Sequence, residues 1–62
     1  MFSGFGKKNK TVKQLRKDKG YTARELAGLI SVNSHLISQV DGRKLKDVPE
    51  PLKTRISDAL DI

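Results

Sequence analysis

The chain of 62 residues has no cysteine, few aromatic side chains and no long apolar segment. Without cysteine, neither a disulfide nor a thiolate zinc site can stabilise the fold, which is consistent with a cytosolic protein. No apolar run approaches the roughly 20 residues of a membrane-spanning helix, and we expect no secretory signal in residues 1–6. With 35% hydrophobic residues, the composition allows one small helical bundle of modest stability.

Residue types that carry enzymatic chemistry are also scarce. The only histidine is His35, and no second histidine or cysteine could join it in holding a metal ion. The sequence has no phosphate-binding glycine loop and no nucleophile–histidine pair, and its 7 acidic residues are scattered. We therefore expect no enzymatic activity, no cofactor, no bound metal and no small-molecule substrate.

Positive charge, in contrast, is abundant and concentrated at one end. The chain carries 13 basic and 7 acidic side chains, for a formal net charge of +6. Residues 1–19 account for all of this excess, because residues 20–62 contain equal numbers of basic and acidic side chains. A one-sided positive field favours a polyanion through counterion release, so nucleic acid is the expected partner. An anionic membrane surface is the weaker alternative, because the basic segment is not strongly amphipathic.

The sequence predicts two parts of the chain, a basic arm and a folded domain. Residues 1–10 contain Lys7, Lys8 and Lys10 together with two glycines, and we interpret them as a flexible basic arm before a folded domain at residues 11–62. Such an arm can follow DNA phosphates or enter a minor groove. The alternative is a disordered start that takes no part in binding.

The most informative segment is residues 22–42, which predicts two short helices joined by a three-residue turn. Leu26 and Ile30 give the first helix an apolar face, and Ile37 and Val40 do the same for the second. The polar residues of the second helix share the other face and are Ser34, His35, Ser38 and Gln39. Short donors and acceptors on a rigid convex face suit base edges in a major groove. The same pattern is also typical of an ordinary solvated helix face.

Capping signals predict where the helices begin and end. Residues 11–14 and 22–25 both match the capping box, and Asn33 is a good N-cap for the helix that follows it. Gly20 can adopt the left-handed backbone conformation that often ends a helix, and Pro51 suits a first helical position. The expected fold is all-α with four helices, at about residues 11–19, 22–30, 33–40 and 51–60.

The order and spacing of these features resemble the helix-turn-helix of phage-repressor DNA-binding domains, the lambda-repressor-like or Cro/C1-type family. The residues that carry the resemblance are Leu26-Ala27, Ile30, Ser31-Val32, Ile37 and Val40, flanked by residues 15–20 and 56–62. The resemblance covers about residues 11–62 and implies a four-helix lambda-repressor-like domain. The departures are Ser31 where glycine is common, Ala23 where glutamine often touches a phosphate, the shortened Asp41-Gly42, and a loop with Pro49 and Pro51.

The resemblance, together with the polar pattern, implies a set of DNA-contacting residues. We expect Gln39 to read bases first, because glutamine can pair bidentately with adenine, and the other expected base contacts are Ser34, His35 and Ser38. The expected phosphate contacts are Thr22, Asn33, Arg43, Lys44, Lys46 and Lys10. Thr22 could instead serve only as a cap, and the basic loop around Arg43 could simply be solvated.

The resemblance also implies an ion pair between Arg16 and Asp41, for which the alternative is a free surface arginine. The implied function is that of a sequence-specific double-stranded DNA-binding transcriptional regulator of bacterial or phage origin, acting in the cytoplasm on the nucleoid. A palindromic operator would need a homodimer, because one module reads only a half-site. The alternative function is a protein-interaction module, such as an anti-repressor or a recombination accessory factor, that reads no bases.

Overall fold

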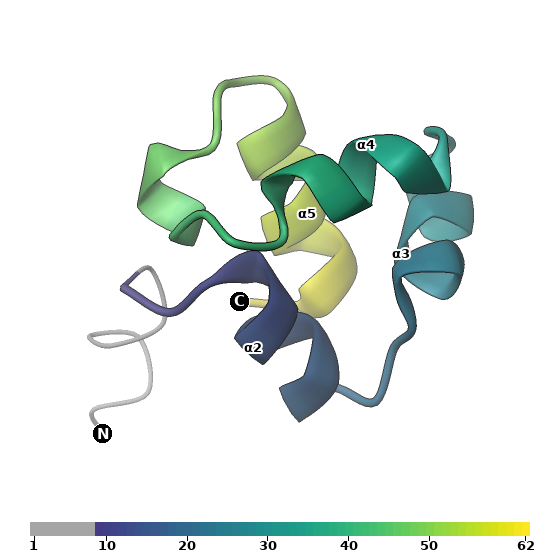
Figure 1. The fold of residues 1–62 in the computed structure, drawn as a ribbon, viewed down its shortest axis with the longest axis horizontal. Coiled ribbons are helices and arrows are strands. Elements are labelled where there is room, and N and C mark those ends of the chain that lie inside the picture. Colours follow the sequence, from purple (N-terminus) through teal and green to yellow (C-terminus); the bar gives the residue numbers. More distant parts are fainter. Residues whose placement is uncertain (1–8) are drawn as a thin grey trace.

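The structure is a computed structural model and describes residues 9–62, so most of the predicted arm lies outside the described residues. Within residues 9–62 the chain forms four α-helices and one short 3-10 helix, with no strand (Figure 1). The helices are α2 (Val12–Asp18), α3 (Ala23–Leu29), α4 (Ser34–Val40), η1 (Leu45–Asp47) and α5 (Leu52–Leu60). In this part of the chain, no helix is both long enough and apolar enough to cross a membrane.

The helices begin where the capping signals predict. The Thr11 hydroxyl accepts a hydrogen bond from the Gln14 amide before α2, and the Thr22 hydroxyl accepts one from the Glu25 amide before α3. Both reciprocal bonds of each capping box are present, so two amides that the helix leaves without partners are satisfied at each start. Asn33 caps α4 through a 2.8 Å bond from the His35 amide to its Oδ1. These three cap predictions are confirmed.

α2 and α3 end in the same backbone motif but with different residues at its left-handed position. After α2 that residue is Gly20, with φ of 81°, and the Tyr21 amide donates back to the Arg16 carbonyl at 3.0 Å. After α3 it is Ser31, with φ of 59°, and the Val32 amide donates to the Ala27 carbonyl at 3.0 Å. Glycine adopts a positive φ without steric cost, whereas a side chain at Ser31 strains the backbone.

Replacing Ser31 with glycine should therefore raise the free energy of unfolding by about 0.5–1 kcal/mol. The left-handed conformation costs a residue with a Cβ about 1–2 kcal/mol, and this relief exceeds the extra freedom that glycine has in the unfolded chain. Urea denaturation followed by circular dichroism measures the change. Ser38→Gly, inside α4, is the matched control and should destabilise the protein instead. A lower midpoint for Ser31→Gly would contradict the assignment of strain to this turn.

The core forms where the apolar faces of the helices meet. Leu26, Ala27, Ile30, Ile37 and Val40 are all buried, which confirms the apolar positions predicted for the two central helices. The other buried hydrophobic residues are Val12, Leu15, Leu45, Val48, Ile56 and Leu60. α3 and α4 form the most extensive helix pair, so the polar side of α4 is held outward by a rigid support.

The segment between α4 and α5 differs from its prediction as a plain loop. Leu45–Asp47 forms the 3-10 helix η1, and Leu45 and Val48 are buried on either side of the turn, as anchors to the core. α5 begins at Leu52 rather than at the predicted Pro51, which instead occupies the N-cap position. The Glu50 carboxylate accepts the Thr54 amide at 2.9 Å, so it supplies the capping acceptor that proline cannot.

Candidate nucleic-acid interface

The polar face of α4 (Ser34, His35, Ser38 and Gln39) is the first part of the candidate interface. His35, Ser38 and Gln39 are exposed, while Ser34 is half-buried at the start of the helix. Leu36 is also half-buried. Because Ile37 and Val40 are buried on the opposite side, rotation of α4 about its axis would cost core contacts, and the orientation of the polar face is fixed.

The start of α2 is joined to the segment that follows α4. The Val12 amide donates to the Arg43 carbonyl at 3.0 Å, and the Lys13 amide donates to the Asp41 carbonyl at 3.1 Å. The Leu45 amide donates in turn to the Lys10 carbonyl at 3.0 Å. Two amides that usually lack partners at a helix start are thus satisfied by carbonyls about 30 residues away. This junction places side chains of α2 beside those that follow α4.

A buried ion pair strengthens the same junction. Arg16 Nη2 lies 2.7 Å from Asp41 Oδ2, and Arg16 Nε lies 3.3 Å from Asp41 Oδ1, so the pair is bidentate. Arg16 Nη1 also donates to the Tyr21 carbonyl at 2.9 Å. The side chains of Arg16 and Asp41 are only 9% and 16% exposed. The predicted ion pair is therefore present, and it ties α2, the approach to α3 and the end of α4 together.

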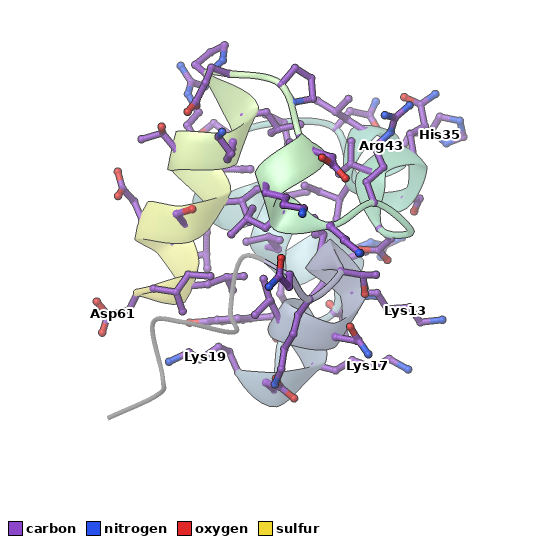
Figure 2. The ribbon with its side chains drawn as sticks, turned by 90° about the vertical axis from the view of Figure 1, so that its left-hand side faces the viewer. Lys13, Lys17, Lys19, His35, Arg43 and Asp61 are labelled. Atoms are coloured by element: carbon purple, nitrogen blue, oxygen red, sulfur yellow. The ribbon has the colours of Figure 1, made fainter. Side chains whose placement is uncertain are left out.

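Basic side chains line the molecule next to the polar face of α4. Figure 2 shows Lys13, Lys17 and Arg43 along the edge that also carries His35, whereas Asp61 lies at the opposite edge. All three basic side chains are exposed, and none has an ion pair within residues 9–62. We call these three residues the basic edge. Lys19, although it follows the same helix, projects toward the side of Asp61.

Sequence reasoning did not single out Lys13 and Lys17 as candidate binding residues. Their spacing of four was the available signal, because residues i and i+4 share one face of a helix. The spacing alone could not show which way that face points. The hydrogen bonds from the start of α2 to the Asp41 and Arg43 carbonyls determine this direction.

The predicted phosphate contacts occupy different surroundings. Arg43, Lys44 and Lys46 are exposed, and the described part of the chain offers no ion pair to any of them. Lys10 Nζ instead lies 3.0 Å from Asp18 Oδ2, so part of its charge is neutralised locally. The predictions for the phosphate and base contacts stay predictions.

Thr22 and Asn33 both use side-chain oxygens as caps. The Thr22 hydroxyl oxygen accepts the Glu25 amide, and the Glu25 carboxylate accepts the Thr22 amide at 2.8 Å, which adds negative charge at the start of α3. Asn33 uses its Oδ1 for the His35 amide, which leaves its amide nitrogen as a donor beside the polar face of α4. Of the two, Asn33 is therefore better placed to hold an anion.

The candidate interface offers hydrogen-bond donors, acceptors and cations, most of them on exposed side chains. Residues 9–62 contain no group of three histidine, aspartate or glutamate side chains that could hold a metal ion. Comparison of the chain with protein-family models, with curated proteins and with solved structures finds no match. The assignment of function therefore depends on the geometry of the polar face and the basic edge.

Proposed function

We propose that this chain is a sequence-specific double-stranded DNA-binding transcriptional regulator of the lambda-repressor-like helix-turn-helix type, from a bacterium or a phage. The observation that carries the proposal is that His35, on the polar face of α4, is exposed along the same edge of the molecule as Lys13, Lys17 and Arg43. Base edges are read by donors and acceptors, and phosphates are held by cations, so a DNA-reading surface needs both together.

In this mechanism α4 enters the major groove. A B-DNA major groove about 12 Å wide admits an α-helix, and the seven residues of α4 span about 10 Å. His35, Ser38 and Gln39 then reach base edges, while Lys13, Lys17 and Arg43 lie on phosphates beside the groove. The bound protein would occlude a promoter and so repress transcription. It would act in the cytoplasm on the nucleoid, without enzymatic activity or a cofactor.

The proposal is tested by titrating salt against binding to a random-sequence duplex. The basic edge together with Lys44 and Lys46 provides about five phosphate contacts, so log Kd should change with log salt with a slope of about 4–5. The competing function, a protein-interaction module, predicts weak binding without a steep slope. Selection from a random duplex library then identifies the bound sequence, and paired half-sites would show that two copies bind together.

Replacing Gln39 with alanine should relax sequence preference at one base position. A bidentate glutamine–adenine pair contributes about 1–3 kcal/mol of discrimination, so the preferred base should lose roughly 5- to 150-fold of its advantage there. Competition binding with single-base variants of the selected site measures the change. Arg43→Ala is the matched control, because loss of a phosphate contact should weaken all sequences alike and lower the salt slope by about 1. Intact base preference in Gln39→Ala would remove Gln39 from the base contacts.

A further inference from the structure

The polar face of α4 carries the only histidine of the chain, His35. Its side chain is exposed, and Figure 2 shows it along the same edge of the molecule as Lys13, Lys17 and Arg43. Histidine is the one side chain whose charge ordinarily changes between about pH 5 and 8. The surface proposed to bind DNA therefore contains one group whose charge depends on pH in the physiological range.

The imidazole ring of His35 has no partner within residues 9–62. The backbone amide of His35 donates to Asn33 Oδ1, but neither ring nitrogen has a hydrogen bond or an ion pair to a described residue. A protonated imidazole presents two N–H donors, whereas the neutral ring presents one donor and one acceptor. The protonated form thus matches a partner that only accepts, such as a phosphate oxygen or the N7 and O6 atoms of guanine.

The carboxylates of the elements around His35 are not bonded to it. On α3, which packs most extensively against α4, Glu25 instead accepts the Thr22 amide at 2.8 Å. Directly after α4, the Asp41 carboxylate is held by Arg16 at 2.7 Å. The other acidic residues of the neighbouring elements, also without a bond to His35, are Asp18, Asp47 and Asp58. A protonated ring therefore has no counterion in this part of the chain.

Bound DNA would supply that counterion. Lys13, Lys17 and Arg43 share the edge with His35, and Arg24 is the cation of α3. A phosphate strand held by the basic edge brings negative charge to the ring, and a nearby opposite charge favours the protonated form of an imidazole. Because linkage is reciprocal, a proton on His35 then strengthens the binding of DNA.

We infer that DNA binding at this surface takes up a proton on His35, so that affinity for DNA rises as the pH falls from about 7.5 to 5.5. The inference rests on the proposed function, because DNA supplies the acceptor for the protonated ring. The contact is complete at low pH, where the ring is charged before binding, and it is lost as the pH rises and the ring becomes neutral. The protein would therefore occupy its DNA site more fully in an acidified cytoplasm.

Fluorescence anisotropy with a duplex at pH 5.5, 6.5 and 7.5, each across a salt series, measures the effect. At 0.1 M salt the wild type should bind about fivefold to tenfold more tightly at pH 5.5 than at pH 7.5, and its salt slope should be larger by about 0.9, as expected for one added cation. His35→Gln keeps a polar side chain that does not titrate, so its affinity should change less than about twofold over this range.

His35→Lys is the matched variant that carries the charge at every pH. It should bind at pH 7.5 about as tightly as the wild type does at pH 5.5, with little further change on acidification. Since the side chain of His35 is exposed, both variants should fold, and circular dichroism at each pH checks this. Single-base variants of the selected site distinguish the two acceptors. Contact with guanine predicts that the pH dependence is lost when one G·C pair is replaced, whereas contact with phosphate predicts that it persists on every sequence.

Two results would overturn the inference while leaving DNA binding in place. One is a wild-type affinity that does not change with pH although the salt slope is steep, and the other is a pH dependence that survives in His35→Gln. A flat salt slope at every pH would instead overturn the proposed function, and the inference with it.

Discussion

Replacing Arg16 with alanine should lower the free energy of unfolding by about 3–5 kcal/mol, the largest loss expected from any single charged residue here. The substitution leaves the Asp41 carboxylate, only 16% exposed, without its cation, and it also removes the bond to the Tyr21 carbonyl. A domain of 62 residues has a total stability of about 3–9 kcal/mol, so this loss is a large fraction of the total.

Thermal and urea denaturation of three variants test this expectation. The double variant Arg16→Met with Asp41→Leu removes both charges and keeps apolar volume, so it should recover much of the stability that Arg16→Ala loses. Arg16→Lys should give an intermediate loss, because an ammonium cannot form the two parallel bonds to Asp41. If Arg16→Ala melted like the wild type, the junction between α2 and α4 would not depend on this ion pair.

Replacing the basic edge, Lys13, Lys17 and Arg43, with glutamine should weaken DNA binding by several hundredfold at 0.1 M salt. Each phosphate contact contributes about 0.9 to the slope of log affinity against log salt, which corresponds to about eightfold at this concentration. Three lost contacts should therefore lower the slope by about 2.7. Since all three side chains are exposed and unpaired within residues 9–62, stability should change little.

The matched control removes three charges that do not belong to the basic edge. Lys19, Lys53 and Arg55 replaced with glutamine make the same change in net charge, and Lys19 projects away from the basic edge in Figure 2. Fluorescence anisotropy with one duplex across a salt series compares the two triple variants. Equal losses for both would mean that net charge alone drives binding. In that case the positions of Lys13, Lys17 and Arg43 on the molecule would not matter for DNA binding.

Local features of the sequence were sufficient to predict most of the fold. The capping residues Thr11, Thr22 and Asn33 form the bonds expected of them, because a cap involves residues only two or three positions apart. The buried positions of α3 and α4 follow from helical periodicity, which also depends on near neighbours. The 3-10 turn η1 was missed because its three residues are too few to show a helical periodicity.

The candidate interface could be predicted only in part. Helical periodicity placed His35, Ser38 and Gln39 on one outward face, and these three side chains are exposed. It could not show that Ser34 is half-buried, because that depends on how α4 is seated on the rest of the domain. The contribution of Lys13 and Lys17 was missed for a similar reason, since the direction of a surface helix face is set by tertiary contacts.

By itself the sequence determined the four α-helices, the starts of α2, α3 and α4, the apolar positions and the surplus of positive charge, because each of these depends on composition or on residues within one or two turns. The tertiary structure decided between the Arg16–Asp41 ion pair, which the resemblance implied, and a free surface arginine. Only the tertiary structure showed that the start of α2 is bonded to the carbonyls of Asp41 and Arg43. It also decided that Leu29 remains uncovered beside Arg55 and Asp58. These contacts join segments that are distant along the chain, and close packing of the whole core selects them.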